Sequence, residues 1–344
     1  MTLKYLIQKE ILQIRRNTFL PKLIIMFPVM IMCVMPWVMQ MEVKNIRVDV
    51  VDIDRTTQSQ RLVHDIEASR YFIFNAMQPT YQAAMKDIEH GKADIIMEIR
   101  DGKYLIAANA VNGTKGAMGS AYLSQIVTKD LRMNGADVLN LYNKGQNYKV
   151  FMIPALLAIV MMLMTGFLPT LNIVGEKETG TIEQINVTPV SKWVFILSKL
   201  IPYWVIALFV VTVCLILAWL VYGITPVGSV WLVYLLAMLL ALFFSSLGLI
   251  ISNYSDTMQQ AIFVMWFFVV CIMLLSGLFT PTRSMPHWAY LSTYVNPMHY
   301  FIDAIRTVFI RGGSFRDIAH QVFALAGIGA VMACWAVQSY KKNS

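Results

Sequence analysis

The sequence predicts a mainly α-helical integral membrane protein with six transmembrane helices. An extracytoplasmic α/β domain is inserted between the first two, and re-entrant helices precede the sixth. Hydrophobic residues make up 57% of the 344-residue chain and charged residues only 14%, whereas soluble domains average about 25% charged. Six apolar stretches are long enough to cross a bilayer core, which takes about 20 residues. Thirteen of the 20 acidic residues fall within residues 40–149, so that part is predicted to be water-soluble.

Residues 1–18 are predicted to form an amphipathic helix on the cytoplasmic membrane surface. Its basic residues fall mainly outside the apolar face, although a plain basic flank is the alternative interpretation. The apolar face consists of residues at helical spacing, namely Leu3, Leu6, Ile7, Ile11 and Ile14. The first span, 19–40, contains three prolines and is expected to be kinked.

The domain predicted at 41–149 alternates strand-like and helix-like segments. "IRVDVVDID" alternates β-branched and polar residues and predicts a strand, and "YFIFNAM", "ADIIMEIR" and "KYLIAAN" predict three more. "TTQSQRLVHDIEAS" begins with threonines suited to a helix N-cap, and "PTYQAAMKDIEHGK" begins with proline and ends with glycine. A third helix is expected at "GAMGSAYLSQIVTKDLRM". These elements indicate a small α/β domain.

The remaining spans and the orientation follow from hydropathy and from lysine and arginine in the short flanks. These basic residues place both termini, including the tail 339–344, and the loop 175–195 in the cytoplasm. Four arginines in 281–317, a segment expected outside, oppose this orientation. The expected spans after the first are 150–174, 196–222, 229–252, 257–280 and 318–338.

Residues 281–317 are aromatic and half-polar, which suits neither a full span nor a free loop. Tryptophan and tyrosine favour the membrane interface. Short helices that dip into the outer leaflet and break near a proline are therefore expected. The residues assigned to this interface are Trp288, Asn296 and Pro297.

The sequence carries no pattern of a catalytic or nucleotide-binding site. It has no G-x-x-x-x-G-K-[ST] phosphate loop, no H-E-x-x-H, no G-x-S-x-G and no C-x-x-C, and its histidines are scattered. The chain is therefore expected to bind no cofactor or metal and to hydrolyse no ATP by itself. Its basic excess suits loops beside membrane lipid rather than nucleic acid, which requires a basic face.

The polar segment "GEKETGTIEQINVTP", residues 175–189, lies between two strongly apolar runs. Spacing alone leaves two interpretations open. One is a solvated loop that ends two spans. The other is a short helix parallel to the membrane, with Glu176, Gly180 and Glu183 roughly along one face presented to a cytoplasmic surface.

Three stretches resemble the permeases of ABC transporters of the type-2 exporter class. "GEKETGTIEQINVTPVSKWVFILSKLIPY" is similar to the signature loop of that family, and "SGLFTPTRSMPHWAYLSTYVNPMHYFIDAIRTVFIRG" is similar to its region after span five. "VDVVDIDRTTQSQRLV" resembles the outer domain of its long-loop branch. Together these matches extend over almost the whole chain.

The resemblance implies a coupling helix that docks on a separate ATP-binding subunit, which uses ATP and Mg²⁺. It also implies a second permease chain, identical or related, and a location in the bacterial inner membrane. A periplasmic adaptor docking on 41–149 is a further expected partner. The residues that match the family's coupling motif are Glu176, Lys177, Glu178, Gly180, Thr181, Glu183 and Gln184.

The function expected from these features is the export of a lipophilic or amphipathic compound. One alternative is an assembly protein that transmits force from an ATPase to the outer domain without transport. Another is a receptor whose outer domain senses a ligand. The longest cytoplasmic segment, 175–195, is too short for a signalling output domain, which weighs against the receptor.

Overall fold

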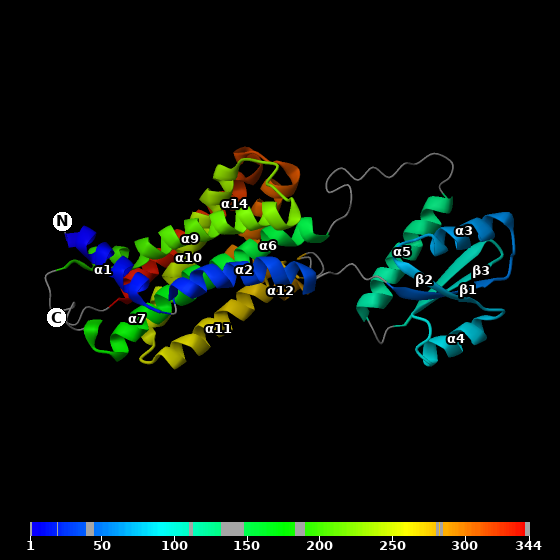
Figure 1. Cartoon of the computed structure of the whole chain (residues 1–344), viewed down its shortest axis with the longest axis horizontal. Coiled ribbons are helices and arrows are strands. Elements are labelled where there is room, and N and C mark those ends of the chain that lie inside the picture. The colour runs from blue at the N-terminus through cyan, green and yellow to red at the C-terminus, as the bar shows by residue number, and fades with distance from the viewer. Residues whose placement is uncertain are drawn as a thin grey trace. The chain divides into compact units, whose positions relative to one another are not determined.

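The structure, a computed structural model, divides the chain into two compact units, shown in Figure 1. A helical unit comprises Met1–Met39 and Tyr142–Ser344, and a sheet unit comprises Gln40–Leu141. The residues that the structure describes are 2–18, 20–38, 45–109, 113–131, 148–182, 190–279, 282 and 285–340.

Five helices in the described part of the chain are long and apolar enough to cross a membrane, which supports an integral membrane protein. Lys149–Glu178 is one continuous helix built from α6 (Tyr148–Met162), the π-helix η1 (Leu163–Phe167) and α7 (Leu168–Glu178). The other four are α2 (Leu20–Val38), α9 (Lys192–Tyr222), α10 (Val230–Tyr254) and α14 (Phe315–Ser339).

The fifth predicted span, 257–280, corresponds to α11 (Met258–Leu274), an apolar helix of 17 residues. At 1.5 Å per residue it is about 25 Å long, whereas the hydrocarbon core is about 30 Å thick. The sixth transmembrane helix therefore stays a prediction. The described residues of this unit also form three shorter helices: α1 (Thr2–Arg16), α12 (His287–Thr293), and α13 (Pro297–Arg306), which continues into the π-helix η3 (Thr307–Arg311).

The core of the helical unit lies around α10 and the helix Lys149–Glu178. The most apolar window of α10 is 78% buried and that of Lys149–Glu178 is 72% buried, whereas the windows of the other three spans are at most 28% buried. α10 contacts α14, α7 and α9. The peripheral helices α2, α9 and α14 thus expose most of their apolar surface, as expected for helices that face lipid or another chain.

A close approach between α10 and η1 depends on two glycines. A β-carbon added at Gly248 would lie 2.7 Å from the carbonyl oxygen of Gly166. That same carbonyl accepts a hydrogen bond of 2.7 Å from the Thr170 hydroxyl. Small residues at helix contacts in membranes allow this kind of backbone approach.

We expect Gly248→Ala to destabilise the helical unit by about 1–3 kcal/mol, because the added methyl group overpacks a backbone contact that cannot yield. Thermal unfolding of the full chain in detergent measures the loss. Gly327→Ala on α14 is the matched control, since a β-carbon there meets nothing within 4 Å. A loss of stability in the control as large as in Gly248→Ala would contradict this account.

The sheet unit is a four-stranded mixed sheet with helices on both faces (Figure 1). The strand order is β2-β1-β3-β4, with β1 parallel to β2 and β3, and β4 antiparallel to β3. Helices α3 and α5 pack on one face and α4 on the other. The bounds are β1 Ile46–Asp52, α3 Thr57–Glu67, β2 Phe72–Met77, α4 Tyr81–Glu89, β3 Ile95–Arg100, β4 Lys103–Ala108 and α5 Gly113–Leu131.

One carboxylate, Asp49 in β1, is completely buried in this unit. Its Oδ1 accepts a hydrogen bond of 2.7 Å from the Asn75 side chain. Its Oδ2 has no hydrogen-bond partner among the described residues. Burial raises the pKa of Asp49 above its ordinary value of 3.8. The hydrogen bond from Asn75 lowers the pKa and the neighbouring charge of Asp87 raises it, and the net shift is upward.

Asp49 therefore lowers the stability of the sheet unit as the pH rises. The folded unit holds this proton more tightly than the unfolded chain, so the free energy of unfolding falls from pH 3.8 upward through the folded-state pKa. We expect Asp49→Asn to stabilise the unit by about 1–2 kcal/mol at neutral pH, because a neutral side chain removes the unpaired charge.

Thermal unfolding of the full chain, followed by a fluorophore on the sheet unit, measures this effect at several pH values. The gain should vanish below pH 3.8, where Asp49 is protonated in both states. Asp65→Asn on the exposed side of α3 is the control. A gain that is independent of pH would contradict the assignment to this carboxyl.

Candidate functional site

Four charged side chains meet where α1, the end of α7 and the first turns of α9 come together. Lys199 on α9 donates hydrogen bonds of 2.7 Å to Glu10 and 2.5 Å to Glu176. Lys9 donates to Glu176 at 2.7 Å and to Glu10 at 3.1 Å. We call Lys9, Glu10, Glu176 and Lys199 the ion cluster. Its two ammonium groups balance its two carboxylates.

The ion cluster is buried on one side and reaches the surface on the other. The side chain of Lys199 is 1% exposed, those of Glu10 and Glu176 are 2% and 5% exposed, and that of Lys9 is 42% exposed. Burial by itself lowers the pKa of Lys9, but the two carboxylates outweigh this and raise it, so Lys9 stays charged. Buried charges of this kind are stable only when they are paired and hydrogen-bonded.

Amide side chains complete the hydrogen bonding of the ion cluster. Asn172 on α7 donates to the second oxygen of Glu10 at 3.0 Å. Gln13 on α1 donates in turn to the carbonyl oxygen of the Asn172 side chain at 3.2 Å. These hydrogen bonds therefore hold α1 to α7 along about one helical turn, and hold α1 to α9 through Lys199.

The next two residues of the predicted coupling segment also bind neighbouring helices, although Glu178 is exposed. Lys177 donates to three backbone carbonyls at the end of α10, those of Ser252, Asn253 and Ser255, at 2.8–3.2 Å. The carboxylate of Glu178 accepts a 2.7 Å hydrogen bond from the backbone N–H of Met258, the first residue of α11. A cation at a helix C-terminus and an anion at an N-terminus both suit the helix dipole.

The outward part of the segment begins where α7 ends. Thr179 is the C-cap, and Gly180 has a φ of +71°, the left-handed conformation that glycine commonly supplies after a helix. The exposed Thr181 donates to the carbonyl of Glu176 at 3.1 Å, and Ile182 is buried. Glu176 thus belongs to the last turn of a membrane-crossing helix, not to a separate surface helix.

Glu183 and Gln184 lie outside the described residues, so the structure says nothing of their part in the coupling segment. Among its described members, Glu176, Lys177 and Glu178 hydrogen-bond to other helices of this chain, and both Glu178 and Thr181 are exposed. The coupling role itself stays a prediction for all seven residues.

The three residues predicted at the re-entrant interface lie on the two short helices α12 and α13. Trp288 on α12 is 70% exposed. Asn296 is the N-cap of α13, where its Oδ1 accepts from the N–H of Met298 at 3.0 Å, and its amide donates to the carbonyl of Ile272 on α11 at 2.8 Å. Pro297 occupies the first helical turn, where a missing N–H costs nothing.

The sequence interpretation missed Lys9, Glu10, Asn172 and Lys199. Two signals could have found the central pair. Lys199 is a lone cation inside an apolar run, and an ionisable residue in such a run requires a partner. Glu10 is the only acidic residue before the first span, and its helical spacing places it on the face of Leu3, Ile7 and Ile14.

A family model and several known proteins are similar to this chain. A family model described as "ABC-2 family transporter protein" matches residues 22–337. The Escherichia coli protein "Probable multidrug ABC transporter permease YbhR" is 24% identical over 360 residues, which cover 98% of each chain. Two other E. coli proteins, "Probable multidrug ABC transporter permease YbhS" and "Inner membrane transport permease YhhJ", are 28% and 26% identical over 175 residues. Each of those matches covers 50% of this chain and 46% of the relative.

Proposed function

Because the chain belongs to the ABC-2 transporter family, we propose that it is the membrane-spanning permease subunit of an ATP-driven exporter. A separate ATP-binding subunit supplies the energy. The exported compound is lipophilic or amphipathic, in line with the multidrug permeases to which the chain is similar. The subunit crosses the inner membrane several times, with both termini in the cytoplasm.

The ion cluster is the observation that supports this proposal most strongly. The segment 175–189 begins within the last turn of the helix Lys149–Glu178. The last turn of this helix is hydrogen-bonded to α1 and α9 through Glu176, to α10 through Lys177 and to α11 through Glu178. A partner that pulls on 175–189 therefore displaces the ends of several helices together.

This arrangement suits a lever driven by ATP. Nucleotide binding brings two ATP-binding subunits together, and each moves the 175–189 segment on which it docks. The resulting equilibrium between inward-open and outward-open states shifts only by the difference in affinity of the ATP-binding subunit for the two states. Hydrogen bonds that hold the helix ends together limit local bending. More of the free energy of nucleotide binding is therefore available to move the helices.

In this proposal the partner subunit, and not this chain, binds ATP and Mg²⁺. The chain has no phosphate loop of its own, and it acts as a transport subunit rather than an enzyme. A second permease chain completes the pathway, and the sheet unit is the part on which a periplasmic adaptor would dock.

Purification of the tagged full chain from its native membranes in a mild detergent tests this proposal. We expect an ATP-binding subunit to co-purify, to be identified by mass spectrometry, and to hydrolyse ATP in the purified sample. A sample that contains no ATP-binding protein and hydrolyses no ATP would contradict the proposal.

A further inference from the structure

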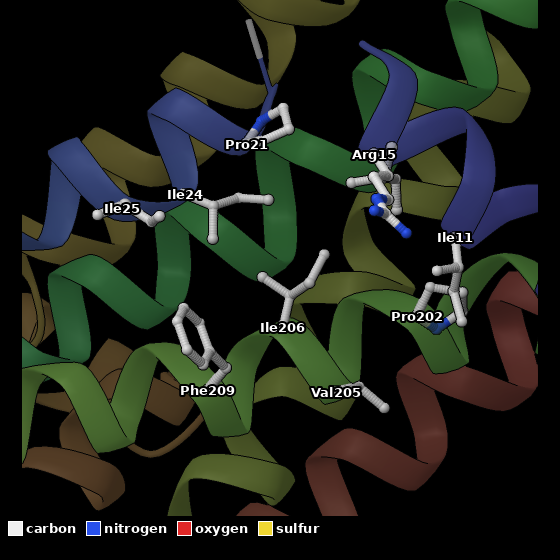
Figure 2. Close-up of a pocket in the computed structure, with 10 residues that line it drawn as sticks. Ile11, Arg15, Pro21, Ile24, Ile25, Pro202, Val205, Ile206 and Phe209 are labelled. Carbon is white, nitrogen blue, oxygen red and sulfur yellow. The ribbon is translucent and has the colours of Figure 1, made fainter. Parts of the chain in front are cut away.

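A cavity of about 320 Å³ lies between α1, α2 and α9, beside the ion cluster but not part of it. Its volume is within the range of about 300–1,000 Å³ that is typical of ligand pockets. Figure 2 shows residues of all three helices around it. The lining is apolar apart from Arg15, and Ile24, Ile206 and Phe209 are among its side chains.

With α1 on the membrane surface and α2 and α9 crossing the membrane, as the sequence predicts, the cavity extends from that surface toward the hydrocarbon layer. Arg15 lies at the end of the amphipathic helix α1, and Pro21 is the second residue of the first span. Ile25 lies six residues into that span, about 8 Å along its axis. On α9, Phe209 lies about 10 Å beyond Pro202. One end of the cavity is therefore polar and near the headgroups, and the other end is apolar and deeper.

Arg15 is suited to bind an anion at the polar end. It is exposed, and within the described part of the chain no carboxylate forms an ion pair with it. Its neighbour Arg16 is also exposed, but it does not line the cavity. A guanidinium group binds phosphate through two parallel hydrogen bonds and is more weakly hydrated than an ammonium group.

We propose that this cavity binds an anionic phospholipid of the surrounding membrane. The phosphate binds the Arg15 guanidinium, and one acyl chain lies between α2 and α9 against Ile24, Ile206 and Phe209. The apolar lining favours a hydrocarbon chain over any polar ligand. The exposed guanidinium of Arg15, which pairs with no carboxylate among the described residues, selects a negative headgroup. The lipid would thereby link α1, which carries half of the ion cluster, to two membrane spans.

Native mass spectrometry of the full chain in detergent tests the proposal, with phosphatidylglycerol and phosphatidylcholine added separately. We expect the wild type to retain phosphatidylglycerol in preference to phosphatidylcholine. Arg15→Gln should lower the retained phosphatidylglycerol about fivefold, because one basic residue near a membrane surface contributes about 1 kcal/mol to the binding of anionic lipid. Arg16→Gln is the matched control and should change it by less than about twofold.

A second variant, Ile206→Phe, tests the acyl-chain position by filling the cavity. We expect it to reduce the retention of both lipids while the thermal unfolding temperature shows that the chain still folds. Equal losses in Arg15→Gln and Arg16→Gln, or equal retention of the two lipids by the wild type, would overturn the proposal. The proposal also fails if the amphiphile that co-purifies and is displaced by Ile206→Phe is not a phospholipid.

Discussion

Lys199→Met is expected to destabilise the helical unit by about 3–5 kcal/mol, because it leaves Glu10 and Glu176 buried with only the partly exposed Lys9 as a cation. The free energy of unfolding of the full chain in detergent, measured against denaturant, reports the loss. The amount of folded protein recovered from membranes should fall in parallel, since losses of this size are a large fraction of the stability of a protein.

Two further variants show whether this loss comes from the ion cluster. Lys192→Met removes an exposed lysine from the first turn of the same helix and should change stability by less than about 0.5 kcal/mol. Glu10→Gln in the Lys199→Met background should recover part of the loss, because it removes one of the two buried negative charges. A Lys199→Met protein as stable as the Lys192→Met protein would show that the cluster does not hold the helices together.

The second large effect concerns the docking of the ATP-binding subunit. Thr181→Arg and Glu183→Lys should lower the capture of that subunit at least about tenfold, since a misplaced charge at the centre of an interface typically costs 2 kcal/mol or more. Neither should change the thermal unfolding temperature of the isolated chain, because Thr181 is exposed and the 175–189 segment is proposed to face the partner.

Glu176→Lys should behave differently from these two variants. It places a third cation in the ion cluster, where Glu176 is 4% exposed, and so lowers both stability and capture. Val227→Arg in the turn between α9 and α10 is the control, because it adds the same charge at another exposed position. Loss of capture in the control, or full capture by both Thr181→Arg and Glu183→Lys, would place the docking surface elsewhere.

The helices of the membrane unit were largely predictable, because an apolar run of sufficient length has few other stable structures. The ends of these helices were harder to predict. The predicted second span ended at residue 174, where charges begin, but the helix continues to Glu178. The charges of Glu176, Lys177 and Glu178 do not stop it because each finds a partner on a neighbouring helix. Hydropathy alone does not show such partners.

The site was predictable as a segment but not in its geometry. The run from Gly175 to Glu183 stands out because polar residues between two spans are concentrated there. The burial of Glu176 depends on its ion cluster with Glu10 and Lys199, and these two are 189 residues apart in the sequence. Spacing within a single helix carries no information about contacts over such distances, so the buried Glu176 was assigned to the same surface as the exposed Glu178 and Thr181.

The measurement that tests the central claim most directly is photo-crosslinking from the full chain in its native membrane. A photoreactive amino acid is placed at Thr181 in one sample and at Val227 in another, both exposed positions. We predict a crosslink to the ATP-binding subunit from Thr181 and none from Val227. A crosslink to that subunit from Val227 and none from Thr181 would contradict the proposal that 175–189 is the surface through which ATP hydrolysis drives this permease.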